Sequence, residues 1–149
     1  MSKKLIQICK KKDFEVLESN CLNLPFIDNV FDVSISIAVI HHLSTEVLRM
    51  AAIKEMSRVT RNMFLIYVWA MESKAKFIEE QDVLIPWNLQ KKGIAKGNNK
   101  VLNRYYHLFK KGELENLVLS IPGLQIIDSY YDHENWSIIG SKQNSLGNI

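Results

Sequence analysis

The alternation of apolar and polar positions along the chain predicts helices and strands in turn. Residues 2–12 carry apolar side chains at helical spacing with lysines on the other face, which indicates a short amphipathic helix. Residues 14–18 predict a short strand. The segment 31–40 is rich in Val and Ile with only small polar residues between them, a pattern typical of a parallel strand covered on both faces. Residues 63–70 predict the next buried strand.

A helix is expected between these two buried strands. Ser44 and Thr45 are good helix-capping residues, and Glu46 suits the positive first turn, so the helix should run to about Val59. After the second buried strand, residues 71–109 predict an irregular basic insert with a flexible loop.

The last third of the chain predicts a helix followed by a hairpin. Residues 112–121 form the helical pattern, which ends before Pro122. The segments 124–132 and 135–142 should pair as an antiparallel hairpin through a short turn. The order of elements predicts an α/β fold, in which ligands bind at the carboxyl ends of the parallel strands.

Length and composition bound the class of protein. The 149 residues suffice for one domain, and we expect it to span residues 1–142 and to be followed by a disordered tail over 143–149. No apolar run reaches the ~18 residues of a membrane-spanning helix, so no membrane association is expected. Cys9 and Cys21 lie far apart in no ligand-like pattern, which favours a reduced, intracellular setting and no metal site.

The net charge is only +3, but the basic residues are concentrated in one block. Between residues 90 and 111 there is no acidic residue, and the basic ones are Lys91, Lys92, Lys96, Lys100, Arg104, Lys110 and Lys111. A lone basic run is usually a solvated loop. Tyr105 and Tyr106 inside the block also fit nucleic acid, because bases stack on aromatic faces and phosphates attract cations.

Six sequence blocks occur in an order that resembles one known family. They are NCLNLPF, FDVSISIAVIHHLST, LIYVWAME, QDVLIPW, RYYHLFKKGELE and ENW. Together they resemble the eukaryotic tRNA 5-carboxymethyluridine methyltransferases, a group that includes the methyltransferase part of the AlkB homologue acting on wobble uridine. The resemblance runs from about residue 5 to residue 142.

The resemblance implies a class I, Rossmann-like methyltransferase fold and S-adenosylmethionine as cofactor. It implies methyl-esterification of 5-carboxymethyluridine at the tRNA wobble position, a small zinc-binding activator protein as partner, and a location in the cytoplasm, with the nucleus as a further site. Two alternatives stay open. One is a non-catalytic remnant that retains RNA or partner binding, and the other is methylation of a small molecule or a protein on the same fold.

The same resemblance carries roles onto individual residues. The catalytic or substrate-side set is His41, His42, Tyr67, Trp69, Arg104, Tyr106, Asn135 and Trp136. The cofactor-side set is Asn20, Cys21, Leu22, Ile37, Ala38, Val39 and His41. Asp82 and Trp87 are expected to pack a loop. For the histidine pair the alternative is a hydrogen-bonded strand end, and for Trp69 it is core packing that brings no contact with substrate.

The chain also departs from the family pattern. No glycine precedes Gly93, so the family's glycine-rich cofactor turn is absent, and Asn20 stands where an aspartate is usual. The strands that normally flank this turn are absent as well. The predicted strand 14–18 would then have no neighbour, and the strand beginning at Phe31 should become an exposed apolar edge.

Overall fold

The computed structural model of the chain describes residues 3–72, 80–89 and 100–143. The first half contains α1 (Lys3–Lys10), β1 (Phe31–Ile37), the 3-10 turn η1 (Ile40–His42), α2 (Glu46–Val59) and β2 (Thr60–Trp69). The second half contains β3 (Asp82–Leu89), β4 (Lys100–His107), α3 (Glu113–Leu119), β5 (Leu124–Asp132) and β6 (Asn135–Lys142).

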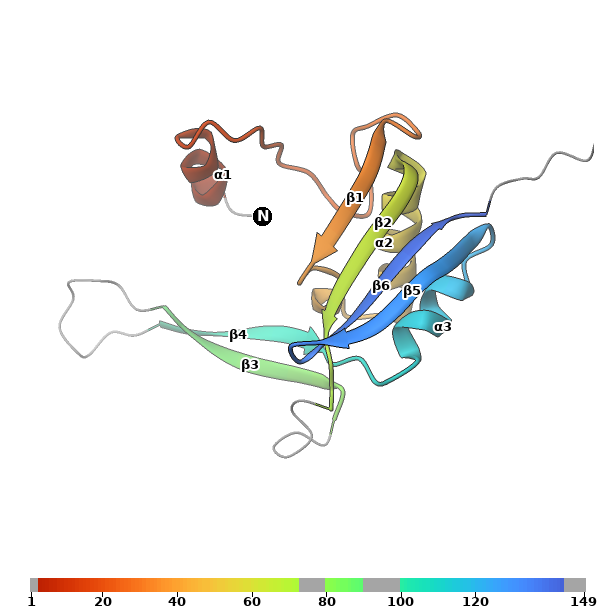
Figure 1. The fold of residues 1–149 in the computed structure, drawn as a ribbon. Helices are drawn as coiled ribbons and strands as arrows, with labels where there is room; N and C mark the ends of the chain where they lie inside the picture. The colour runs from red at the N-terminus through yellow and green to blue at the C-terminus, as the bar shows by residue number, and fades with distance from the viewer. Residues whose placement is uncertain (1–2, 73–79, 90–99, 144–149) are drawn as a thin grey trace, which may run out of the picture.

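A four-stranded sheet in the order β1-β2-β6-β5 is the centre of the fold (Figure 1). β1 and β2 run parallel, while β6 runs antiparallel to both β2 and β5. The predicted closing hairpin is confirmed within its predicted bounds. His133 and Glu134 join its strands, with φ values of 41° and 67°, as a two-residue turn of the primed type requires.

The core lies between this sheet and the two helices α2 and α3. Phe64, Ile66 and Val68 alternate along β2 and are buried against the helices. The predicted helix after Ser44 is confirmed, and the hydroxyl of its N-cap Thr45 accepts the N–H of Leu48 at 3.3 Å. α3 also confirms the predicted second helix, although it is shorter at both ends.

The prediction of an irregular insert is wrong for the part of it that the structure describes. β3 and β4 pair along their whole length as an antiparallel ribbon, which extends away from the main sheet (Figure 1). Each strand of the ribbon pairs the backbone N–H and C=O groups of the other. No local sequence pattern predicted this pairing. Residues 73–79 and 90–99, and with them Lys91, Lys92 and Lys96, lie outside the described residues, as does the predicted tail beyond residue 143.

The predicted strand over residues 14–18 is also wrong, because these residues form no strand. The physical reason is that an extended segment forms a strand only where a neighbouring strand pairs its N–H and C=O groups, and residues 14–18 have no such neighbour. The prediction that segment 31–40 is a strand covered on both faces is wrong for β1, where Val33, Ile35 and Ile37 are 52%, 65% and 53% exposed. The prediction of an exposed apolar edge is confirmed, because β1 is the end strand of the sheet. The strand ends at Ile37, three residues earlier than expected, because the chain turns into η1.

α1 confirms the predicted amphipathic helix but stands apart from the sheet (Figure 1). Its apolar residues Leu5 and Ile8 are exposed. No helix in the described part of the chain is long and apolar enough to cross a membrane. Cys9 and Cys21 are both free thiols.

Candidate functional site at the ends of β1 and β2

The chain leaves β1 through a residue with unusual backbone geometry. Ala38 donates its N–H to the carbonyl of Tyr67 at 3.0 Å, the last bond that continues the β1–β2 ladder. Its φ is 56°, in the left-handed region that side chains other than glycine rarely adopt. This turn directs the chain into η1, so that His41 and His42 lie beside the carboxyl end of β2.

His41 is built into the end of the sheet. It is 1% exposed, and its Nδ1 accepts the backbone N–H of Trp69 at 3.1 Å. Burial first, and then the nearby charges of His42 and Arg104, together lower the pKa of His41 to about 3. The ring is therefore neutral at pH 7 with its proton on Nε2, which is buried and has no hydrogen-bond partner among the described residues.

An aromatic cluster joins η1, β2 and β4. The rings of Trp69 and Tyr106 stack with centroids 4.4 Å apart and planes 11° apart. His41 lies 5.6 Å from the Trp69 ring and 5.2 Å from the Tyr106 ring, while His42 lies 4.4 Å from Tyr106. Four of the predicted catalytic residues thus come together, and Tyr106 covers Trp69 from the β3–β4 hairpin.

His42 and Arg104 line an open cavity of about 630 Å³ beside this cluster. The other lining residues are Ala38, Leu102, Asn103 and Tyr105. His42 donates from Nδ1 to the carbonyl of Tyr105 at 2.9 Å, because a carbonyl can only accept. A guanidinium, an imidazole and a backbone turn therefore surround one open cavity at the strand ends.

The remaining predicted catalytic residues lie at the β5–β6 turn. The Tyr67 hydroxyl donates to the Asp132 carbonyl at 3.0 Å, and partial burial followed by the Asp132 charge raises its pKa. Asn135 pairs with Trp69 across the β2–β6 ladder, and its side chain donates to the His133 carbonyl at 2.6 Å. Both residues are therefore tied to the turn.

Trp136 lies apart from the aromatic cluster. It pairs with Val68 across the ladder, so its side chain shares the core face of the sheet and not the face of Trp69. Its ring packs edge-on against Tyr131 at 5.0 Å, and its Nε1 donates to Glu72 at 3.0 Å. The structure does not place Trp136 with His41 and Trp69.

The predicted cofactor-side residues 20–22 belong to a loop that is fastened to α2. Asn20 closes the loop by accepting the N–H of Leu22 at 3.0 Å. The Arg58 guanidinium donates to the carbonyls of Leu24 and Phe26 at 3.1 and 2.8 Å, and Glu55 accepts the Leu24 N–H at 2.6 Å. These hydrogen bonds hold the loop where Cys21 faces β1 across a cavity.

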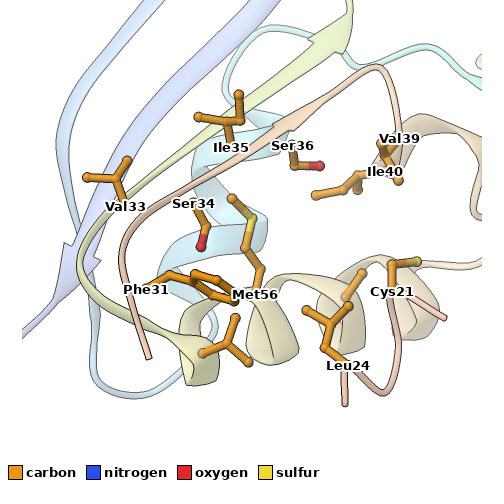
Figure 2. A pocket seen from close by; sticks show the side chains of 12 residues that line it. Cys21, Leu24, Phe31, Val33, Ser34, Ile35, Ser36, Val39, Ile40 and Met56 are labelled. Carbon is orange, nitrogen blue, oxygen red and sulfur yellow. The ribbon is translucent and has the colours of Figure 1, made fainter. Parts of the chain in front are cut away.

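A cavity of about 360 Å³ lies between this loop, β1 and α2 (Figure 2). Its lining is mainly apolar and contains Cys21 and Val39 of the predicted set, while Asn20, Leu22, Ile37, Ala38 and His41 are not among its lining residues. The hydroxyls of Ser34 and Ser36 are its only side-chain oxygen atoms among the described residues that line it. The cavity suits a flat apolar ring and supplies no charge for an amino-acid group.

The sequence analysis missed two buried polar residues behind the hairpin, His107 and Arg49. His107 lies between Asp82 and Glu113, and Arg49 lies buried on α2 over the Phe109 ring at 5.8 Å. The block RYYHLFKKGELE contains His107 and Glu113 six positions apart. That spacing could have suggested a contact only if the turn between β4 and α3 had been known. Among the described residues no group of three His, Cys, Asp or Glu is arranged to hold a metal ion.

Known proteins resemble the chain in sequence. Residues 1–66 match a family model described as a methyltransferase domain. A tRNA (carboxymethyluridine(34)-5-O)-methyltransferase from Schizosaccharomyces pombe is 39% identical over 158 residues, which cover 93% of this chain and 68% of that protein. A tRNA (carboxymethyluridine(34)-5-O)-methyltransferase from Xenopus tropicalis, alkbh8, is 32% identical over 194 residues. The match covers 95% of this chain and 31% of the frog protein. The chain thus spans less than a third of the frog relative.

Solved structures resemble the chain in fold. A protein from Pyrococcus horikoshii aligns with a TM-score of 0.65 at 16% identity, covering 94% of this chain and 66% of that one. An S-adenosylmethionine-dependent methyltransferase from Clostridium acetobutylicum aligns with a TM-score of 0.67 at 11% identity, covering 95% and 72%. At such identities the likeness shows the fold alone, which is the class I methyltransferase fold.

Proposed function

The chain belongs to the tRNA (carboxymethyluridine(34)-5-O)-methyltransferase family, and from this premise we propose that it acts in methyl-esterifying the wobble carboxymethyluridine of tRNA. The observation that carries the proposal is the cavity beside His42. Arg104 lines it, and the stack of Trp69 and Tyr106 lies next to it. A guanidinium beside flat rings suits a nucleobase that bears a carboxylate.

The reaction asks little of the protein as an acid or a base. A carboxylate is already ionised at neutral pH, so it can attack without losing a proton to the enzyme. The neutral, buried state of His41 is compatible with this requirement. Arg104 would hold and orient the carboxylate, because the guanidinium fork matches its two oxygens. Catalysis would rest on alignment and on exclusion of water.

S-adenosylmethionine is the cofactor of the proposed reaction, and when bound it supplies an electrophilic methyl group on a sulfonium. Of the predicted cofactor-side residues, Cys21 and Val39 line the apolar cavity beside β1, a position that fits contact with the cofactor. They would hold the flat adenine. The described lining residues contain no charged partner for the amino-acid end of the cofactor, so the fit is partial.

Two measurements on the purified chain test the proposal. Titration with S-adenosylmethionine by calorimetry should give saturable binding, and an anticodon stem-loop RNA with carboxymethyluridine should bind more tightly than the same RNA with uridine. Arg104→Gln should remove this preference. Lys110→Gln is the matched control, since Lys110 is exposed and is not among the residues lining the cavity. A preference that survives Arg104→Gln would contradict the assignment of Arg104.

A second candidate function is RNA or partner binding without methyl transfer. The lack of a charged partner in the described lining of the apolar cavity favours it. No saturable cofactor binding at millimolar concentration, in a chain shown to be folded, would support this candidate over the first. Its RNA affinity should then fall as salt rises, because phosphate contacts release counterions. Affinity that is independent of salt would count against RNA contact through the basic residues.

A small zinc-binding activator protein is the proposed protein partner, and the family resemblance alone supports it. Co-expression tests the pairing. An activator of this class should co-purify with the chain and raise its midpoint of thermal unfolding, as any partner that binds only the folded state does. Separate elution of the two proteins would count against the partnership.

A further inference from the structure

His107, at the end of β4, lies between carboxylates from two other elements. Its Nδ1 is 2.7 Å from Oδ1 of Asp82 on β3, and its Nε2 is 2.5 Å from Oε1 of Glu113 on α3. The His107 side chain is only 7% exposed. One imidazole therefore connects the β3–β4 hairpin to the body of the protein.

Only the protonated ring can donate to both carboxylates. A neutral imidazole carries one N–H, so its other nitrogen would direct a lone pair at a carboxylate oxygen less than 3 Å away. That contact would be repulsive for either tautomer. The geometry thus requires a proton on each ring nitrogen when the hairpin is in its observed position.

Further groups hold the two carboxylates in place. Glu113 accepts from the side chain of Gln81 at 2.6 Å and from the N–H of Lys110 at 3.0 Å. Asp82 accepts the hydroxyl of Tyr105. With these contacts, neither carboxylate depends on His107 alone for its orientation.

The charges around His107 oppose one another. Burial and the Arg49 cation on α2 lower its pKa, but the hydrogen bonds to Glu113 and Asp82 and the charge of Glu113 outweigh them, so the pKa of His107 is raised above its usual 6.5. The same contacts hold the pKa values of Asp82 and Glu113 below their usual range. Phe109 packs edge-on against the ring at 4.9 Å and bears no charge.

We propose that His107 is a positioning residue, which as an imidazolium locks the β3–β4 hairpin against α3 and so holds Tyr106 on Trp69 and Arg104 at the cavity. The docking of the hairpin does not depend on the proposed function. The expected effect of this docking on RNA binding does rest on the proposed function, because that effect assumes that Arg104 contacts the substrate.

The lock has a defined pH window. Because the folded pKa of His107 is raised, its contribution is complete below about pH 6.5 and is lost as the pH rises through the folded value. Asp82 and Glu113 set the acid limit of the window, because their folded pKa values are lowered. Their contribution to the docking is lost as the pH falls through those folded values. The hairpin should be most firmly docked in mildly acidic solution.

Hydrogen exchange of His107→Gln tests the proposal. A Gln side chain offers a donor to one carboxylate and an oxygen to the other, as a neutral histidine does. Peptides from β3 and β4 should exchange about tenfold faster than in the native chain, while peptides from α2 and β6 stay unchanged. His133→Gln is the matched control, because His133 is 92% exposed and contacts a single carboxylate. Unchanged exchange in the hairpin would overturn the proposal.

A measurement on the native chain decides the matter if His107→Gln does not fold. Nitrogen-15 NMR of the imidazole rings should show His107 with both nitrogens protonated below pH 6.5 and a titration midpoint above the ordinary histidine value of about 6.5. Amide signals of the hairpin should shift with the same midpoint. A midpoint at or below 6.5, or hairpin signals that do not follow it, would overturn the lock. Both readouts are independent of cofactor and RNA, so failure of the proposed function would not be mistaken for failure of the lock.

Discussion

The backbone N–H of Trp69 donates to Nδ1 of His41 at 3.1 Å, so a side chain completes the hydrogen bonding of a strand. β1 has already ended at this level, and the imidazole takes the position that its next carbonyl would have filled. The same ring packs beside Trp69 and Tyr106. His41 thereby joins the end of the sheet to the aromatic cluster of the candidate site.

Removing this acceptor should destabilise the fold. His41→Ala removes the acceptor of the Trp69 N–H and opens a cavity at a buried position, for an expected loss of about 2–4 kcal/mol in the free energy of unfolding. Urea denaturation measures it. His133→Ala, at an exposed position, should change stability by less than about 0.5 kcal/mol. Equal effects of the two substitutions would show that the His41 hydrogen bond contributes nothing.

His41 should also make the protein sensitive to acid. Its folded pKa of about 3 lies below the ordinary 6.5, so the unfolded state binds more protons between these values. Stability should therefore fall as the pH falls below 6.5, with a slope of up to about 1.4 kcal/mol per pH unit from this one group. His41→Asn should lose that slope. Denaturant midpoints between pH 4 and 7 provide the measurement, and an unchanged slope in the variant would contradict the assignment.

Trp69 tests whether the stacked ring serves packing, substrate or both. Trp69→Ala removes the partner of Tyr106 and should cost about 2–4 kcal/mol of stability. Trp69→Phe keeps a stacked ring and should cost less than about 1.5 kcal/mol. If the indole also walls the substrate, Trp69→Phe weakens RNA binding more than it weakens folding. Binding that falls only in step with stability would leave Trp69 a packing residue.

Gly140 on β6 is predicted to be intolerant of any side chain. A Cβ atom there would lie 2.4 Å from Cζ of Phe64 and 3.2 Å from the carbonyl of Gln125. Gly140→Ala should cost about 1–3 kcal/mol through overpacking. Adding Phe64→Leu should return part of that loss. A double-mutant cycle measures the coupling, and strictly additive effects would mean that the two residues do not collide.

The open edge of β1 should govern the solution behaviour of the chain. Ile35→Lys introduces a charge into an exposed apolar strand edge and should reduce self-association with little change in stability. Val47→Lys is the matched control, since Val47 is an exposed apolar residue on α2. Sedimentation velocity over a range of concentrations distinguishes them. A similar improvement from both substitutions would indicate a general charge effect and no role for the edge.

Local patterns predicted the elements whose signal lies within a few residues. Three such signals are confirmed by the structure: the cap at Thr45, the apolar periodicity of α2 and the turn at His133-Glu134. Each of them depends on residues that are close together along the chain. The family blocks predicted that His41 and Trp69 would meet. The β3–β4 ribbon was missed because its paired residues lie 11 to 25 positions apart, beyond the reach of a local turn pattern. Residues 14–18 form no strand because they have no neighbouring strand to pair with.

The sequence by itself determined the alternation of elements, the exposed edge on β1 and the identity of the side chains near the strand ends. The tertiary structure decided which of those side chains share a face. It placed Trp136 on the core side of the sheet, away from Trp69, and buried His107 between Asp82 and Glu113. The physical reason is that strand parity and long-range pairing depend on register between distant segments, whereas propensity, capping and turn chemistry depend only on neighbours along the chain.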